Sequence, residues 1–184
     1  MTNILMNEAC SHLKSGGVIA YPTEAVWGLG CDPMNEQAVH RILNLKEREV
    51  EKGLILVAAD EAQIEPILKN LTESELNSLR STWPGPVTWL IPDPEDLYPS
   101  WVKGTHRSVA IRISAHPLVH SLCSAFGTPI ISTSANKAGE PEIRSRLRIE
   151  EVFSSSIDFV LDGDLGDSSQ PSQIRDLVSG AILR

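Results

Sequence analysis

Four polar clusters follow apolar runs or turns, and the first is Tyr21-Pro22-Thr23-Glu24. Pro22 fixes one backbone angle and lacks an N–H donor, so the chain turns and presents the Thr23 hydroxyl and the Glu24 carboxylate at the end of a predicted strand. Ligands of open α/β sheets bind at such strand ends. The alternative is that Thr23 caps a helix with Glu24 in its first turn, and the segment taken alone favours this cap.

The second cluster places Lys46, Arg48 and Lys52 among three glutamates, directly before an apolar run. Alternating charges of this kind are usually a solvated surface, and that interpretation is favoured in isolation. The functional interpretation is that the three cations bind a triphosphate. Arg48 then offers a planar fork, and the lysines act as point charges.

The third cluster joins the rigid turn 83–86 and the following Thr88 to Arg112, which lies in another apolar run. A turn explains the prolines and the glycine, but it does not explain a threonine and an arginine within apolar strands. A buried arginine is rarely tolerated without an anionic partner. Arg112 is therefore expected to meet either a carboxylate of a ligand or one of the protein.

The fourth cluster is Ser132-Thr133-Ser134-Ala135-Asn136, joined by Ser172. Hydroxyls and small residues let backbone amides approach an anion, as phosphate-binding loops require, although a Ser/Thr-rich turn is the structural alternative. The sequence has no G-x-S-x-G elbow, which argues against a serine hydrolase. It also has neither a Walker A motif nor G-x-G-x-x-G, so an ATP site would follow another scheme.

A possible metal site consists of His116, His120 and Cys123, which fall on one face of a predicted helix. Zinc ligands can have this spacing, but a fourth ligand is missing and apolar residues share the helix. Packing or capping is the favoured interpretation. We therefore assign no metal ligand among the side chains.

Nucleic acid is disfavoured as a general partner, because 16 Lys and Arg against 24 Asp and Glu give a net charge of −8. Arg144, Arg146 and Arg148 could contact RNA phosphates, but nearby glutamates make a solvated loop the favoured interpretation. Any phosphate site must therefore be local.

The elements that position these clusters alternate between helices and strands, which predicts an α/β or α+β fold. Strands are predicted at 18–21, 54–58, 87–91, 109–113, 129–131, 159–161, 174–178 and 181–183. Helices are predicted before Gly16, at 36–46, 61–69 and 72–81, and after Pro117, with a long irregular loop at 92–105. The 184 residues, of which 41% are apolar, suit one domain. Three cysteines at unrelated spacings suit reduced thiols, and the absence of a membrane-length apolar run favours a cytoplasmic protein.

Taken in order, the clusters resemble the YrdC family over essentially the whole chain. The matching motifs are Tyr21-Pro22-Thr23-Glu24 with Trp27-Gly28, Lys46-x-Arg48 with Lys52-Gly53-Leu54, Pro84-Gly85-Pro86-Val87-Thr88, Ser132-Thr133-Ser134-Ala135-Asn136, and Pro171-Ser172-x-Ile174-x-Asp176. Two positions depart from the family pattern: Glu49 stands where a proline is common, and Ala138 stands where a serine is common.

The resemblance implies a single domain over residues 1–184, with a twisted mixed β-sheet, outer helices and a deep cationic cavity, related to the RibB-type fold. It implies an L-threonylcarbamoyladenylate synthase, a nucleotidyltransferase that makes this adenylate and pyrophosphate from L-threonine, bicarbonate or CO₂, and ATP with Mg²⁺. This is the first step of N6-threonylcarbamoyladenosine formation in tRNAs that read ANN codons. The product would pass to a tRNA threonylcarbamoyl transferase complex of the TsaD, TsaB and TsaE type.

The same resemblance implies roles for individual residues. The ATP site would contain Lys46, Arg48, Lys52, Thr88, Ser134, Asn136 and Arg184. Of these, Lys46, Arg48 and Lys52 would also act in catalysis. The threonine site would contain Thr23, Arg112, Ser132 and Ser172. Weak binding of tRNA or double-stranded RNA is a further expectation. An RNA-binding module without ATP turnover is the rival function, and an enzyme acting on another carbamoyl or phosphate substrate is the runner-up.

Overall fold

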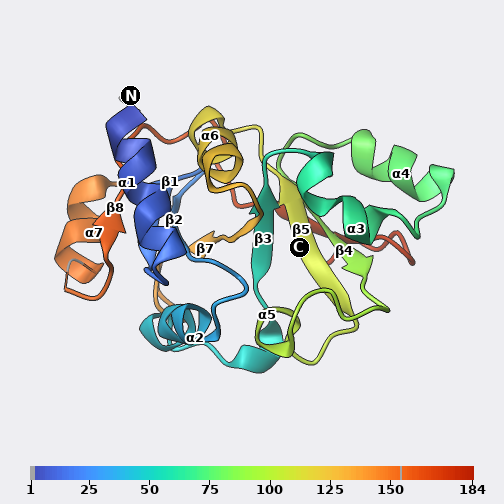
Figure 1. Cartoon of the computed structure of the whole chain (residues 1–184), viewed down its shortest axis with the longest axis horizontal. Coiled ribbons are helices and arrows are strands. Elements are labelled where there is room, and N and C mark those ends of the chain that lie inside the picture. The colour runs from blue at the N-terminus through green and yellow to red at the C-terminus, as the bar shows by residue number, and fades with distance from the viewer. Residues whose placement is uncertain (1–2, 154) are drawn as a thin grey trace.

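The computed structural model describes residues 3–153 and 155–184, and Figure 1 shows its strands surrounded by helices. The helices are α1 (Asn3–Lys14), α2 (Glu36–Leu45), α3 (Glu65–Leu68), α4 (Glu73–Arg80), α5 (Ser100–Lys103), α6 (Pro117–Phe126) and α7 (Arg146–Phe153), with the 3-10 turns η1 (Val50–Lys52) and η2 (Glu61–Ile64). The strands are β1 (Ile19–Pro22), β2 (Trp27–Gly30), β3 (Ile55–Ala58), β4 (Val87–Pro92), β5 (Ser108–Ile113), β6 (Ile130–Ile131), β7 (Thr133–Ser134), β8 (Phe159–Val160) and β9 (Gln173–Asp176).

The strands form two mixed sheets. In the first, of order β7-β2-β1-β8, β1 runs antiparallel to β2 and parallel to β8. In the second, of order β6-β3-β5-β4-β9, β3 is parallel to β5, while β4 is antiparallel to β5 and parallel to β9. The α/β class predicted from the alternating elements is confirmed, and the mixed strand pairing is distributed over two sheets.

The two sheets are joined at Ser132. This residue separates β6, which pairs with β3, from β7, which pairs with β2. The Ile131 amide donates to the Cys31 carbonyl at 2.9 Å, and the Ser132 amide donates to the Ile55 carbonyl at 2.8 Å. Figure 1 accordingly shows β7 between β2 and β3. Residues 130–134 thus bring side chains of both sheets to one place.

Strand β3 is buried on both faces. Leu56 and Ala58 belong to one hydrophobic cluster, whereas Val57 belongs to a second cluster with Leu13 of α1 and Leu122 of α6. A strand covered on both faces is expected to be a continuous apolar run and not an alternating one. This explains why the sequence pattern located β3 correctly.

The boundaries of α2, α4 and α6 follow local signals. The side chain of Asn35 caps α2, and Thr72 forms a capping box with Glu75 at the start of α4. Pro117 opens α6, and Gly127 ends it with a φ of 97°. Among the described residues, no helix combines the length and apolar character needed to cross a membrane.

Four sequence predictions about local structure are wrong. The long loop predicted as irregular at 92–105 contains the short helix α5. No helix follows Thr23, because the chain returns directly into β2, with the Thr23 amide bonded to the Val26 carbonyl at 3.1 Å. The predicted solvated loop at 144–148 overlaps the helix α7, which begins at Arg146. The predicted strand at 181–183 is reduced to an isolated bridge between Arg175 and Ile182.

Gly30 should not tolerate a side chain, because a Cβ atom there would lie 2.6 Å from the Ile131 carbonyl oxygen and 2.7 Å from Tyr21 Cε1. We expect Gly30→Ala to lower the free energy of unfolding by about 1–3 kcal/mol, since extra volume in a packed core displaces its neighbours. Gly180→Asn is the matched control, because no heavy atom lies within 4 Å of a Cβ there and asparagine adopts positive φ. Urea unfolding measures both variants, and an unchanged Gly30→Ala would contradict the observed packing.

Candidate active site

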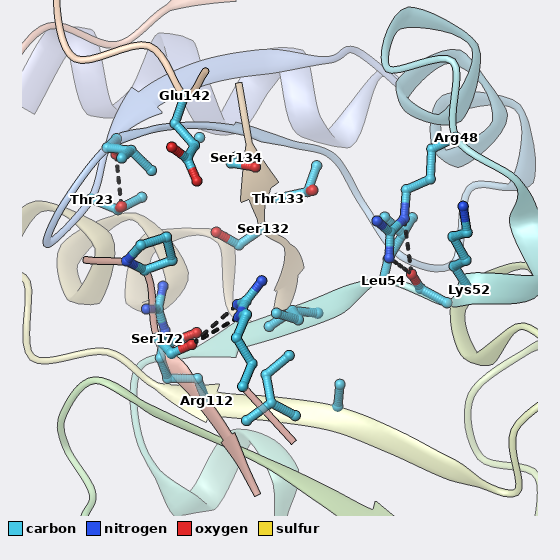
Figure 2. A pocket seen from close by; sticks show the side chains of 18 of the residues that line it. Thr23, Arg48, Lys52, Leu54, Arg112, Ser132, Thr133, Ser134, Glu142 and Ser172 are labelled. Atoms are coloured by element: carbon cyan, nitrogen blue, oxygen red, sulfur yellow. Dashed lines mark hydrogen bonds between the residues drawn. The ribbon is translucent and has the colours of Figure 1, made fainter. Parts of the chain in front are cut away.

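A cavity of about 550 Å³ lies between the two sheets, and both sheets contribute to its wall (Figure 2). With the exception of Thr88, all the site residues predicted from the sequence line it: Thr23, Lys46, Arg48, Lys52, Arg112, Ser132, Ser134, Asn136, Ser172 and Arg184. Figure 2 shows Arg48 and Lys52 on one side of the cavity, and Thr23, Arg112 and Ser172 on the other. The cavity therefore brings together clusters that are far apart in the sequence.

The wall of the cavity is cationic although the chain is acidic. Among the described residues, six Lys or Arg and two Glu side chains line it: Lys46, Arg48, Lys52, Lys103, Arg112, Arg184, Glu24 and Glu142. The whole chain carries a net charge of −8. Positive charge concentrated in a cleft raises the local concentration of anionic ligands. The expectation of a local phosphate site thus has a structural basis.

The turn that carries Thr23 is held by its own residues and by a distant loop. The Thr23 hydroxyl donates to the Val26 carbonyl at 2.7 Å, so it stabilises the turn between β1 and β2. The amides of Gly166 and Ser168 donate to the carbonyls of Thr23 and Glu24, both at 3.0 Å. A Cβ atom at Gly166 would lie 2.9 Å from the Cα of Glu24, so only glycine permits this approach.

Arg112 has a carboxylate partner within the protein. Its Nη2 atom lies 3.4 Å from Oε2 of Glu24, and both side chains are about nine-tenths buried. Oε1 of Glu24 accepts a hydrogen bond from the Ser114 hydroxyl at 2.6 Å. Burial alone would raise the pKa of Glu24, but the charge of Arg112 and the Ser114 hydrogen bond bring it below its ordinary value. Glu24 is therefore a carboxylate at neutral pH and stabilises Arg112 at the cavity wall.

His116 supports the Glu24–Arg112 ion pair. It does not form a metal site with His120 and Cys123, the two residues with which the sequence grouped it. Its backbone amide donates to the Ser114 hydroxyl at 3.1 Å, and its Nε2 atom lies 3.1 Å from the Asp164 carbonyl. His120 is exposed, whereas the buried Cys123 thiol bonds the carbonyl of Val57. No group of three His, Cys, Asp or Glu side chains within 3–153 and 155–184 is arranged to hold a metal ion.

Lys46 is buried at the cavity wall. Its ammonium donates to the Ser134 carbonyl, to the Asn136 carbonyl at 2.8 Å and to Oδ1 of Asn136 at 3.4 Å. Burial lowers the pKa of Lys46 to about 8; the positive charge of Arg48 acts in the same direction, and Glu142 opposes it. The structure thus attaches Lys46 to the fourth polar cluster of the sequence.

Arg48 and Lys52 lie on the same side of the cavity as a pair of more accessible cations. Nη2 and Nε of Arg48 donate to the Gly53 carbonyl at 2.8 and 3.3 Å. Burial lowers the pKa of Arg48, and repulsion from Arg184 contributes. Lys52 is exposed and pairs with Glu49 at 3.1 Å. Because a surface ion pair of this kind is weak, Lys52 can turn to a ligand at little cost.

Arg184 and Ser172 meet on the other side of the cavity. Nη2 and Nε of Arg184 donate to the Ser172 carbonyl at 3.1 and 3.3 Å. The Ser172 and Thr88 hydroxyls are 2.9 Å apart, and Thr88 is fully buried. Thr88 therefore lies behind the wall and positions Ser172.

Sequence reasoning missed several residues of the wall. Glu142 carries an exposed carboxylate on a loop facing Ser134 (Figure 2), and nothing in its sequence neighbourhood distinguishes it from nearby glutamates. Ser108 of β5 is also part of the wall, and its position four residues before Arg112 on the same strand was a usable signal. The carboxylate partner expected for Arg112 is Glu24, which the sequence placed in the first cluster without this role.

This chain matches a family model and is similar to curated proteins along nearly its whole length. The family model for Sua5, YciO and YrdC proteins, described as "Telomere recombination", matches residues 11–184. A threonylcarbamoyl-AMP synthase of Pseudomonas aeruginosa (strain UCBPP-PA14) is 57% identical over 172 residues, which are 94% of this chain and 92% of the relative. A protein of the same name from Pseudomonas putida is 49% identical over 184 residues, covering 100% and 98%.

Solved structures of similar fold extend the comparison. P. abyssi Sua5 complexed with L-threonine has a TM-score of 0.89 and 31% identity, and covers 97% of this chain. This chain spans 53% of that longer protein. E. coli YciO has a TM-score of 0.87 and 21% identity, covering 100% of this chain and 89% of that one. At this identity the likeness to YciO concerns the fold alone.

Removing the charge of Glu24 should destabilise the protein. We expect Glu24→Gln to lower the free energy of unfolding at pH 7 by about 3 kcal/mol, because it leaves Arg112 buried without its counter-charge. Because the folded pKa of Glu24 is lowered, its contribution is present above the ordinary glutamate pKa and is lost as the pH falls through the lowered value.

Denaturant unfolding between pH 7 and pH 3 measures this difference, which should shrink in the acid range. Glu61→Gln is the matched control, because Glu61 also pairs with an arginine, Arg80, but at an exposed site. We expect that exposed pair to contribute less than about 1 kcal/mol. Equal effects of the two variants at pH 7 would contradict the role assigned to Glu24.

Proposed function

Since the chain belongs to the Sua5, YciO and YrdC family, we propose that it is a threonylcarbamoyl-AMP synthase. It joins L-threonine, bicarbonate or CO₂, and ATP into L-threonylcarbamoyladenylate, and it releases pyrophosphate. The observation that carries this proposal is a cavity with a buried arginine on one side and two accessible cations on the other. Such a cavity suits two anionic substrates that must react with each other. Similarity along nearly the whole chain to proteins of that name supports the same conclusion.

We assign the side of the cavity near Arg112 to L-threonine. The guanidinium of Arg112 binds the substrate carboxylate, because Glu24 already fixes it at the wall. The hydroxyls of Ser132 and Ser172 and the turn at Thr23 complete this half of the site. Threonine has matching groups in its carboxylate, amine and hydroxyl.

We assign the opposite side to the phosphates of ATP. Arg48 and Lys52 bind the β- and γ-phosphates, and Ser134 and Asn136 line the wall of the ATP site. Arg184 contacts the nucleotide from the side of Ser172, whose carbonyl it bonds. Thr88, behind the wall, acts on the other half of the site, because its hydroxyl lies 2.9 Å from that of Ser172. Lys46 adds positive charge to this half of the site.

The reaction then needs little covalent chemistry from the protein. The threonine nitrogen forms a bond to the carbon of CO₂ and loses a proton, which yields a carbamate. A carbamate oxygen attacks the α-phosphorus of ATP, and the bond from that phosphorus to pyrophosphate breaks. The chain holds the reactants in line and compensates negative charge, and these are the main sources of rate enhancement in such transfers.

We propose that Mg²⁺ enters with ATP. The described residues hold no set of three acidic or histidine ligands, which fits an ion that retains waters and binds substrate phosphates with one or two carboxylates. Glu142 suits this role, because it is one of two acidic residues on the described wall and the other, Glu24, is paired with Arg112. When bound, Mg²⁺ neutralises phosphate charge.

We place the protein in the cytoplasm, where its product serves N6-threonylcarbamoyladenosine formation in tRNA through the tRNA threonylcarbamoyl transferase complex. Weak RNA binding remains a prediction of the resemblance. The arginines of α7 give little support to RNA binding, because their charges are already paired. Arg146 pairs with Glu150 and Asp162 at 2.8 Å, and Arg148 pairs with Glu151 at 3.0 Å.

Omission of single substrates tests the proposed function. We expect pyrophosphate to form only when ATP, L-threonine and bicarbonate are all present with Mg²⁺, because the carbamate is the nucleophile. A coupled pyrophosphate assay measures this, with each component left out in turn. Salt-dependent RNA binding without any pyrophosphate release would instead favour the RNA-binding module.

Replacement of Arg48 tests the assignment of the phosphate side. We expect Arg48→Ala to reduce pyrophosphate release at least ~100-fold, because a charged donor is removed from the transferring phosphates. Arg80→Ala is the matched control, since Arg80 is an exposed arginine that pairs with Glu61 and does not line the cavity. Retained activity in Arg48→Ala would contradict the phosphate-binding role.

A further inference from the structure

The hydrogen-bonding capacity of Lys46 is already used within the protein. An ammonium group has three N–H donors. Lys46 has three oxygen acceptors in the described structure, namely the carbonyls of Ser134 and Asn136 and the Asn136 side-chain oxygen. With 5% of its surface exposed, Lys46 has little room to reorient toward another partner. No donor therefore remains for direct contact with a phosphate.

The main chain of Lys46 holds the same loop. The Ala138 amide donates to the Lys46 carbonyl at 2.8 Å, so side chain and backbone of one residue bind both ends of the segment 134–138. The side-chain Nδ2 of Asn136 donates to the carbonyl of Lys137 within the segment at 3.0 Å and to that of Glu140 just beyond it at 2.8 Å. These contacts hold the segment beside Lys46, whose ammonium bonds the carbonyls of Ser134 and Asn136. Figure 2 shows the Ser134 side chain at the cavity.

The neighbouring cations of the wall differ in this respect. Arg48 has five donors, and the described structure uses only its Nε and one Nη2 proton, both on the Gly53 carbonyl. Lys52 has one partner, the exposed carboxylate of Glu49. Both residues thus retain donors for an anion, whereas Lys46 does not.

We propose that Lys46 is a positioning residue, which fixes the segment 134–138 so that Ser134 and Asn136 form the cavity wall. This inference rests on the proposed function, because it divides the labour among the cations assigned to ATP. Arg48 and Lys52 contact the phosphates. Lys46 acts through the segment and adds a charge that its carbonyl partners do not neutralise.

Hydrogen exchange of the ligand-free protein, measured by mass spectrometry on peptides spanning 133–140, tests the proposal. We expect Lys46→Met to raise exchange of this segment at least about tenfold, because all three side-chain hydrogen bonds to its oxygens are lost together. Lys52→Met is the matched control, since it removes a cation from the same wall without a contact to the segment. It should leave the exchange unchanged.

Lys46→Arg separates positioning from direct phosphate contact. Arginine keeps the charge and binds phosphates well, but its planar fork cannot direct donors to three oxygens arranged around an ammonium. We expect the segment to exchange as fast in Lys46→Arg as in Lys46→Met. We also expect Lys46→Arg to reduce pyrophosphate release at least ~10-fold. If Lys46 contributed its charge alone, arginine would replace it without this loss. Full activity of Lys46→Arg with a loosened segment would overturn the proposal.

Wild-type exchange of the segment in Lys46→Met would also overturn it. If Lys46→Met does not fold, Asn136→Ala replaces it, because that variant removes one of the three oxygens and keeps the ammonium. Unchanged exchange in Asn136→Ala would then count against the proposal. The exchange is read without substrates, so its result is independent of the substrate-omission assay that tests the proposed function.

Discussion

The main physical constraint on this structure is that several positive charges share one cavity. Main-chain carbonyls accept the hydrogen bonds of three of these cations: Arg48 donates to Gly53, Arg184 donates to Ser172, and Lys46 donates to the loop beside it. A carbonyl dipole satisfies a buried donor without cancelling its charge. The cavity therefore keeps its positive potential while its hydrogen bonds are made. A wall lined with glutamates would have satisfied the same donors and removed the attraction for anions.

The remaining repulsion is visible in the pKa values of the cations. Burial lowers the pKa of Arg184, and the positive charge of Arg112 adds to this effect. The pKa of Arg48 is lowered in the same way by burial and by Arg184. A bound polyphosphate would relieve this repulsion, so part of the energy stored in the folded state favours binding. Charges fixed in advance are also effective in catalysis, because they need no reorganisation when negative charge moves. Among the wall arginines in the described part of the chain, Arg112 is the most enclosed and the one with a carboxylate partner. The wall lysines Lys52 and Lys103 also pair with carboxylates, those of Glu49 and of Asp93 and Asp96.

Sequence patterns located the elements that have a continuous apolar run or a local capping signal. The apolar runs of β3, β4 and β5 and the caps of α2, α4 and α6 are local signals, and the structure confirms those elements. Strand β2 was missed because half of Trp27–Gly30 is glycine, which is depleted in strands.

The Thr-Glu pattern at 23–24 matched a helix cap, but tertiary contacts hold that segment as a turn between strands. The sequence indicated that Arg112 needs an anion, yet it could not identify Glu24, which lies 88 positions earlier in the turn between two strands of the other sheet. The contacts of Lys46 were likewise undetectable, because they depend on carbonyl directions.

The junction of the two sheets at Ser132 links these features. The carbonyls that hold the cations belong to segments from both sheets, so the geometry of the cavity depends on how the sheets are joined. The backbone amides of Ile131 and Ser132 attach this junction to each sheet in turn, and Gly30 permits the close approach. In-line attack requires that the threonine side and the phosphate side stay at a fixed separation, since small displacements of reacting groups reduce the rate steeply. The same contacts that close the core therefore also set the distance between the two substrates.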